Sequence, residues 1–180
     1  MPNVLTLSRI GLIPVFVALF LVDQSPSIAV VSAAVFAVAS ITDWLDGYLA
    51  RRRQEITDFG KLLDPIADKV LVLAALVVLV EASRAPGWLV IILLAREFAV
   101  TALRAVAAIA GHVIPADRLG KWKMGAQTAA VLVLILEPTL PAWGHRVGVG
   151  LLLAATALAL VSGWQYATAY RRTLGSTAPS

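Results

Sequence analysis

Residues 27–51, SIAVVSAAVFAVASITDWLDGYLAR, form an apolar run that ends in two aspartates and an arginine. An α-helix needs about 20 apolar residues to cross the hydrocarbon core of a bilayer, which matches the length of this run. Ionised side chains cost about 2.5–3.5 kcal/mol each inside a membrane helix, so charges at the end of such a run mark a candidate functional site. The stretch therefore predicts a membrane helix with a functional charged end.

The whole chain has the composition of a membrane protein. Of its 180 residues, 59% are hydrophobic and 14% are charged, and the mean hydropathy is +0.85. The lack of cysteine excludes disulfides, thiol nucleophiles and thiolate-bound metals. The net charge of +4 does not indicate nucleic acid, because the basic residues flank apolar segments and do not form one face. We therefore expect membrane lipids, and no nucleic acid, as partners.

Short polar or proline-containing segments divide the chain into six apolar segments, each long enough to span a membrane. The six predicted spans are residues 5–22, 27–51, 61–81, 87–110, 120–137 and 146–170. We expect an all-α integral membrane domain of six transmembrane helices over residues 1–172. A disordered tail is predicted over residues 173–180.

The basic residues predict how this domain is oriented. An even number of spans places both termini on one side, and cytoplasmic loops carry an excess of lysine and arginine. The basic residues on the side of the termini are Arg9, Arg51, Arg52, Arg53, Lys61, Arg118, Lys121, Lys123, Arg171 and Arg172. The opposite loops hold Arg84 and Arg146. We expect a multi-pass protein of the cell (inner) membrane, with both termini and the active site facing the cytoplasm.

Two predicted helix faces carry the acidic residues. The face at the end of the second span consists of Asp43, Asp46, Gly47 and Ala50. The face at the start of the third span consists of Gly60, Asp64 and Asp68. Antiparallel helices joined by a short loop bring such faces together. Four carboxylates are therefore predicted to converge just inside the cytoplasmic interface.

The chemistry of this carboxylate group favours metal binding. Four neighbouring anions need protons or cations to neutralise them, and all-oxygen ligands favour Mg²⁺ or Mn²⁺. A pair of such ions assists phosphoryl transfer, and the small residues leave room for a ligand against the backbone. The alternative is that the aspartates form interfacial salt bridges with Arg51, Arg52, Arg53 and Lys69.

The same residues resemble the signature of a known family, the CDP-alcohol phosphatidyltransferases. The matching pattern is Asp43-x2-Asp46-Gly47-x2-Ala50-Arg51-x8-Gly60-x3-Asp64-x3-Asp68. The resemblance implies that Asp43, Asp46, Asp64 and Asp68 hold two divalent cations, with Asp68 also the base that deprotonates the acceptor alcohol. It implies nucleotide contacts from Asp43, Asp46, Gly47, Ala50, Arg51 and Gly60. The donor implied is CDP-diacylglycerol, with CMP as the leaving group.

A second group of charged residues lies in and beside the predicted fourth and fifth spans. Arg96, Val100 and Arg104 share one helix face, and an arginine within a span is a functional-site candidate. The alternative for Arg96 is internal pairing, with the adjacent Glu97 or with an aspartate. Arg104, Arg118, Lys121 and Lys123 could form a cationic pocket for the phosphate of an acceptor, or could contact anionic lipid headgroups.

The stretches PNVLTLSRIGLIPVF (2–16), REFAVTALR (96–104) and LGKWK (119–123) resemble the bacterial branch of the family whose acceptor is glycerol 3-phosphate. That resemblance implies a phosphatidylglycerophosphate-forming enzyme of phospholipid biosynthesis, and a homodimer. Within the family, the alternatives are a cardiolipin synthase and an enzyme that accepts inositol phosphate. A cation transporter that uses the carboxylates is a more remote alternative, because we find neither an internal repeat nor a midplane site.

Overall fold

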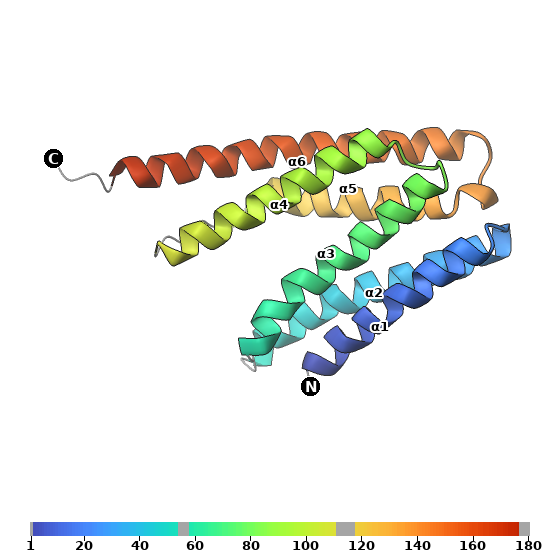
Figure 1. Cartoon of the computed structure of the whole chain (residues 1–180), viewed down its shortest axis with the longest axis horizontal. Helices are drawn as coiled ribbons and strands as arrows, with labels where there is room; N and C mark the ends of the chain where they lie inside the picture. Colours follow the sequence, from blue (N-terminus) through green and yellow to red (C-terminus); the bar gives the residue numbers. More distant parts are fainter. Residues whose placement is uncertain (1, 54–57, 111–117, 177–180) are drawn as a thin grey trace.

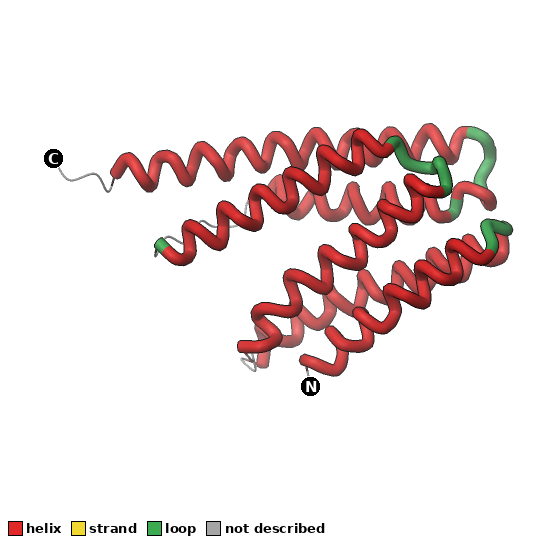
Figure 2. The backbone as a smooth tube through the Cα atoms, viewed as in Figure 1, coloured by secondary structure: helices red, strands yellow, loops and turns green. Residues whose placement is uncertain are grey.

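The computed structural model describes residues 2–53, 58–110 and 118–176, with side chains described for residues 11–42, 69–110, 119–120 and 122–171. The helices are α1 (Pro2–Val22), α2 (Pro26–Arg53), α3 (Asp58–Glu81), α4 (Gly87–Ile109), α5 (Arg118–Ile135) and α6 (Trp143–Ser176), with a 3₁₀ helix, η1 (Glu137–Thr139), before α6. Loops within this part of the chain are short (Figure 2). No strand occurs in the described ranges, so the all-α class is confirmed there.

The predicted spans agree with the observed helices to within a few residues at most ends. Polar and proline residues end the helices where the sequence predicts, for example between Val22 and Pro26. In that connection Asp23 accepts hydrogen bonds from the Ser25 amide (2.9 Å) and hydroxyl (2.7 Å), which lower the pKa of the Asp23 carboxyl. The helix α6 extends to Ser176, into the segment predicted as a tail, and residues 177–180 lie outside the described part.

The helices pack in two groups. The first helix, α1, packs against α2 and α3, while α6 packs against α5 and α4, and contacts of α5 with α2 and α3 join the groups. Figure 1 shows the connections after α1, α3 and α5 at one side of the molecule. The first residues of α1, α3 and α5 and the last residues of α2, α4 and α6 point to the other side (Figure 1). This up-and-down order matches the alternation that successive membrane spans require.

The core consists of apolar side chains from all six helices. Its largest fully buried members are Phe16, Phe36, Leu76, Leu79, Leu89, Leu93, Val131, Leu134, Ile135 and Leu152. The Phe16 ring lies 5.9 Å from that of Phe36, between centroids, which joins α1 to α2. A glycine allows α5 and α6 to approach closely, because a Cβ at Gly148 would lie 2.5 Å from Leu134 Cδ2.

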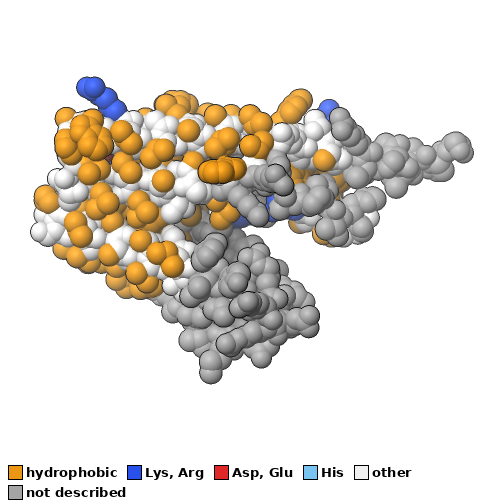
Figure 3. Space-filling view, turned by 180° about the vertical axis from the view of Figure 1, so that it is seen from behind, with side chains coloured by type: hydrophobic (Ala, Val, Ile, Leu, Met, Phe, Trp, Pro, Cys, Tyr) orange, Lys and Arg blue, Asp and Glu red, His pale blue; other side chains and the backbone are white. Residues whose placement is uncertain are grey.

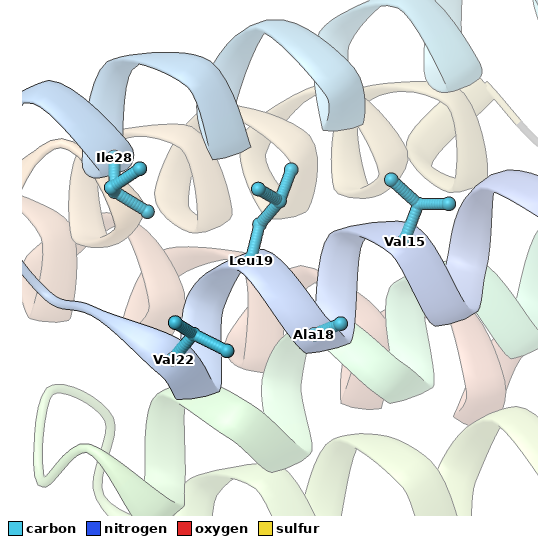
Figure 4. A pocket seen from close by; sticks show the side chains of 5 residues that line it. All are labelled: Val15, Ala18, Leu19, Val22 and Ile28. Atoms are coloured by element: carbon cyan, nitrogen blue, oxygen red, sulfur yellow. The ribbon is translucent and has the colours of Figure 1, made fainter.

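The outside of the bundle is also apolar. Phe98 is 59% exposed and Ile91 is 68% exposed, and apolar side chains cover much of the described surface in Figure 3. A shallow groove of about 320 Å³ between α1 and α2 has only apolar lining: Val15, Ala18, Leu19, Val22 and Ile28 (Figure 4). Soluble proteins rarely expose apolar surface on this scale, so the exterior fits a hydrocarbon environment.

Among the described residues, one segment is long and apolar enough to cross a membrane by length and composition alone, Trp143–Arg171 of α6. Shorter apolar segments occupy Gly11–Val22, Pro26–Thr42 and Trp122–Ile135. Exposed tryptophans lie near both ends of the helices: Trp88 and Trp143 near one end, Trp122 and Trp164 toward the other. Six spans with cytoplasmic termini stay a prediction.

Candidate active site

The aspartate signature lies on the facing ends of two consecutive helices. Asp43 and Asp46 belong to the last turns of α2, and Asp64 and Asp68 to the first turns of α3. Only residues 54–57 separate the two helices, so at 3.8 Å per residue the α-carbons of Arg53 and Asp58 lie at most about 19 Å apart. The chain itself therefore keeps these two acidic helix ends close to each other.

The axial positions of the aspartates also correspond. At about 1.5 Å per residue, Asp43 lies roughly 15 Å before the end of α2, and Asp68 roughly 15 Å after the start of α3. The side chains of the signature residues lie outside the described part of the structure, as do those of Arg118 and Lys121. Their convergence and their ligand roles stay predictions. The donor set, four carboxylates without histidine or thiolate, fits a hard divalent cation.

The residue after Asp68 connects this end of α3 to α4. The Lys69 ammonium group donates a hydrogen bond to the Thr101 hydroxyl, and that hydroxyl donates to the backbone oxygen of Glu97 at 2.7 Å. Lys69 is one of the cations that could instead pair with the aspartates. In the described residues its partner is Thr101, which ties the acidic end of α3 to the charged segment of α4.

A polar cluster, made of Arg96, Glu97, Lys123 and Ser162, joins α4, α5 and α6. The Glu97 carboxylate oxygen Oε1 accepts from Arg96 Nη1 at 2.9 Å and from the Lys123 ammonium group. The Glu97, Arg96 and Lys123 side chains are 19%, 11% and 6% exposed. Charges this far from solvent need partners, and here each has one of opposite sign. The structure thus shows the alternative considered for Arg96, internal pairing with Glu97.

Arg96 also binds α6 directly. Its Nε donates to the carbonyl oxygen of Ala159 at 2.6 Å, and its Nη2 donates to the Ser162 hydroxyl. A Cβ at Gly163 would lie 3.2 Å from Arg96 Nε and 3.4 Å from Arg96 Cγ. Glycine at this position therefore lets the arginine side chain lie against the α6 backbone.

About two turns after Arg96 on α4, and one turn after Ser162 on α6, Arg104 contacts an aromatic ring. The Arg104 guanidinium carbon lies 4.7 Å from the centroid of the Tyr166 ring. Arg104 is exposed, while Tyr166 is 6% exposed. Val100 lies between the two arginines and would touch a Cβ at Gly163 at 3.6 Å. The prediction that Arg96, Val100 and Arg104 share one helix face is thus confirmed, and that face packs on α6.

Of the predicted acceptor residues, the structure describes the side chains of Arg104 and Lys123. They do not share a partner in the described contacts, because Arg104 lies on Tyr166 while Lys123 binds Glu97. Sequence reasoning missed the α6 residues Ser162, Gly163 and Tyr166. The adjacent small residues Ser162 and Gly163 were the available signal, since small residues mark close helix contacts.

Comparison with known proteins identifies the family of the chain. The family model of the CDP-alcohol phosphatidyltransferases matches residues 1–163, which end just before Tyr166. A protein of Bacillus subtilis (strain 168) named CDP-diacylglycerol–glycerol-3-phosphate 3-phosphatidyltransferase is 45% identical over 92% of each chain. A protein of that name in Pseudomonas fluorescens is 41% identical, over 92% of this chain and 87% of the relative. Another in Rickettsia bellii (strain RML369-C) is 37% identical over 96% of each chain. The chain therefore belongs to the CDP-alcohol phosphatidyltransferase family.

Proposed function

We propose that the chain transfers the phosphatidyl group of CDP-diacylglycerol to glycerol 3-phosphate, forming phosphatidylglycerophosphate and CMP. The observation that carries this proposal is the name shared by relatives that are 37–45% identical over most of their length. The family signature, complete from Asp43 to Asp68, supports the reaction class.

The reaction needs a base, an acceptor site and a leaving group that can depart. An acceptor hydroxyl oxygen attacks the phosphorus that carries diacylglycerol, its proton passes to Asp68, and the bond from that phosphorus to the CMP oxygen breaks. Divalent cations held by Asp43, Asp46, Asp64 and Asp68 would supply electrostatic stabilisation of the diphosphate charge. We assign the nucleotide contacts to the ends of α2 and α3, on the basis of the family signature.

The acceptor phosphate is a small dianion, and it needs cationic donors near the aspartates. We assign this role to Arg104, Arg118, Lys121 and Lys123, on α4 and α5. The hydrogen bond from Lys69 to Thr101 supports the assignment, because it connects α3, just after Asp68, to the helix that carries Arg104.

We further propose six membrane spans, with both termini and the site on the cytoplasmic side. The up-and-down order of the helices, the apolar exterior and the exposed tryptophans support this proposal. A site at the interface lets the acyl chains of the donor stay in the bilayer while glycerol 3-phosphate arrives from water. Self-association as a homodimer stays a prediction from the family resemblance.

The proposal is tested by identifying the lipid product. The purified protein, reconstituted with CDP-diacylglycerol and Mg²⁺, is offered glycerol 3-phosphate, phosphatidylglycerol or inositol phosphate, and CMP and lipid masses are measured. Of the three acceptors, we expect only glycerol 3-phosphate to react, and to give equal amounts of phosphatidylglycerophosphate and CMP. Cardiolipin formed only with phosphatidylglycerol would overturn the acceptor assignment. Cation flux into liposomes without CMP release would overturn the enzyme assignment.

A further inference from the structure

The contact between Arg104 and Tyr166 is of the kind that preorganises an arginine side chain for binding an anion. Arginine side chains are long and lose conformational freedom when they bind, so a support that holds the guanidinium beforehand improves affinity. The Tyr166 ring is 6% exposed and lies at 4.7 Å from the guanidinium carbon of the exposed Arg104. A buried ring thus supports an exposed cation.

The position of the ring is set by the contacts that precede it on α6. Arg96 binds the Ala159 carbonyl and the Ser162 hydroxyl, and Gly163 lies against Arg96 and Val100. These contacts fix α4 against α6 within about two turns of Tyr166. The ring is therefore held by the packing of two helices and does not depend on a loop.

The chemistry of the contact leaves Arg104 available for an anion. A guanidinium has five N–H donors, so a cation–π contact at 4.7 Å with one ring leaves donors able to bind two oxygens of one phosphate. Arginine differs from lysine here, because a lysine ammonium is a compact point charge that lacks the planar fork of donors for two phosphate oxygens.

We propose that Tyr166 is a positioning residue that holds Arg104 for the phosphate of the acceptor. This inference rests on the proposed function, because it assigns the phosphate to glycerol 3-phosphate. Tyr166 lies beyond the residues that the family model matches, so the inference derives from the Arg104–Tyr166 contact in this chain.

The test measures steady-state constants for both substrates in wild type, Tyr166→Phe, Tyr166→Leu and Arg104→Ala. Tyr166→Leu should raise the KM for glycerol 3-phosphate roughly three- to thirtyfold, the range expected from losing a cation–π contact. The KM for CDP-diacylglycerol and kcat should stay within about twofold, because the donor contacts are assigned to α2 and α3 and the reacting groups are unchanged. Tyr166→Phe keeps the ring and should stay close to wild type.

A double-mutant cycle tests whether Tyr166 acts through Arg104. With Arg104→Ala already present, adding Tyr166→Leu should change the KM for glycerol 3-phosphate by less than about twofold. Full additivity of the two changes would overturn the proposal. An equal rise of the KM for glycerol 3-phosphate in Tyr166→Phe and Tyr166→Leu would also overturn the proposal, since the face of the ring would then make no difference.

Fluorinated phenylalanines at position 166 keep the shape of the ring if Tyr166→Leu fails to fold. Each added fluorine weakens the negative face of the ring, so the KM for glycerol 3-phosphate should rise stepwise with fluorine number. A KM independent of fluorine number would overturn the inference.

Two controls separate this inference from neighbouring explanations. If Arg104 instead binds anionic lipid headgroups, the effect of Tyr166→Leu should vanish in zwitterionic vesicles, and that result would overturn the proposal. Wild-type consumption of glycerol 3-phosphate tests the proposed function alone. If wild type consumes glycerol 3-phosphate and Tyr166→Leu has an unchanged KM for it, only the role of Tyr166 is overturned. If wild type does not consume glycerol 3-phosphate, the proposed function and the role of Tyr166 are both overturned.

Discussion

The guanidinium group of Arg84 donates a hydrogen bond of 3.1 Å to the carbonyl oxygen of Ile135, the last residue of α5. The same group donates to the side-chain oxygen of Gln24 at 3.1 Å and lies 5.1 Å from the centroid of the Phe20 ring. Burial lowers the pKa of the Arg84 guanidinium, and the charge of Glu137 opposes that shift. Arg84, in the connection between α3 and α4, thus contacts the connection between α1 and α2 and the end of α5. These contacts lie at the end of the molecule opposite the aspartates.

Replacing Arg84 with alanine should destabilise the fold. The substitution removes two hydrogen bonds from a charged donor and leaves the Ile135 carbonyl without this partner. We expect the free energy of unfolding in detergent to fall by about 2–4 kcal/mol, on the usual scale of such bonds. The matched control is Arg146→Ala, because Arg146 lies at the same end and is exposed. Equal stability of the two variants would show that the Arg84 contacts contribute nothing.

Gly148 should not tolerate a side chain. A Cβ there would lie 2.5 Å from Cδ2 and 2.7 Å from Cγ of Leu134, whose side chain is fully buried. Gly148→Ala should therefore lower the free energy of unfolding by about 1–3 kcal/mol through overpacking. Gly150→Ala is the control, because its Cβ would have nothing within 4 Å, and it should be neutral or stabilising by up to about 1 kcal/mol. A harmless Gly148→Ala would contradict the close approach of α5 and α6.

Asp68→Asn should abolish most of the activity and should change donor binding less. The amide keeps the shape of the carboxylate but does not accept a proton, so kcat should drop by about 10²–10⁴-fold, the usual contribution of a general base. Asp23→Asn serves as the control, since Asp23 lies in the distant connection between α1 and α2. A kcat for Asp68→Asn within threefold of wild type would exclude an essential base at this position.

Removing divalent cations should stop turnover reversibly. If carboxylates hold two cations, EDTA should abolish CMP release, and added Mg²⁺ or Mn²⁺ should restore it. Calorimetric titration of the metal into wild type and into Asp64→Asn gives a readout apart from activity, and the variant should bind fewer ions or bind them more weakly. Full turnover after rigorous chelation would rule out the metal-assisted mechanism.

Single cysteines should label from opposite sides of the membrane. The natural chain has no cysteine, so Ser83→Cys and Arg171→Cys each introduce a single thiol. Both positions are exposed, one in the connection before α4 and one near the end of α6. An impermeant maleimide should modify Ser83→Cys in intact cells and Arg171→Cys only after permeabilisation. Labelling of both in intact cells would contradict the six-span topology.

The helices were predictable because length and hydropathy determine them locally. The apolar runs end at prolines, glycines and charges, so α1 and α3 end where the sequence predicts, at Val22 and Glu81. The shared face of Arg96, Val100 and Arg104 followed from 100° per residue, a property of one helix alone. The candidate aspartate site could be recognised from its spacing, and its side-chain geometry stays a prediction.

The contacts between helices were not predictable in the same way. Arg84 belongs to a loop expected at the outer surface, yet it is 7% exposed, because its partner is a backbone oxygen distant in sequence. Every residue has such an oxygen, so no sequence pattern singles out Ile135. Likewise, nothing local to α4 indicates that Tyr166 of α6 is the partner of Arg104. The choice of partner depends on how the helices pack, which single-helix periodicity does not encode.

The length of α6 has a mechanical consequence. Its 34 residues, at about 1.5 Å each, make a helix roughly 50 Å long, whereas the hydrocarbon of a bilayer is about 30 Å thick. If α6 crosses a bilayer with its first turns at one interface, roughly 20 Å of helix would project past the other interface. In Figure 1 this end of α6 extends beyond the end of α4. A fluorescent reporter attached rigidly to this end of α6 would move with the helix. Its emission anisotropy would therefore follow the tilt of α6 during turnover.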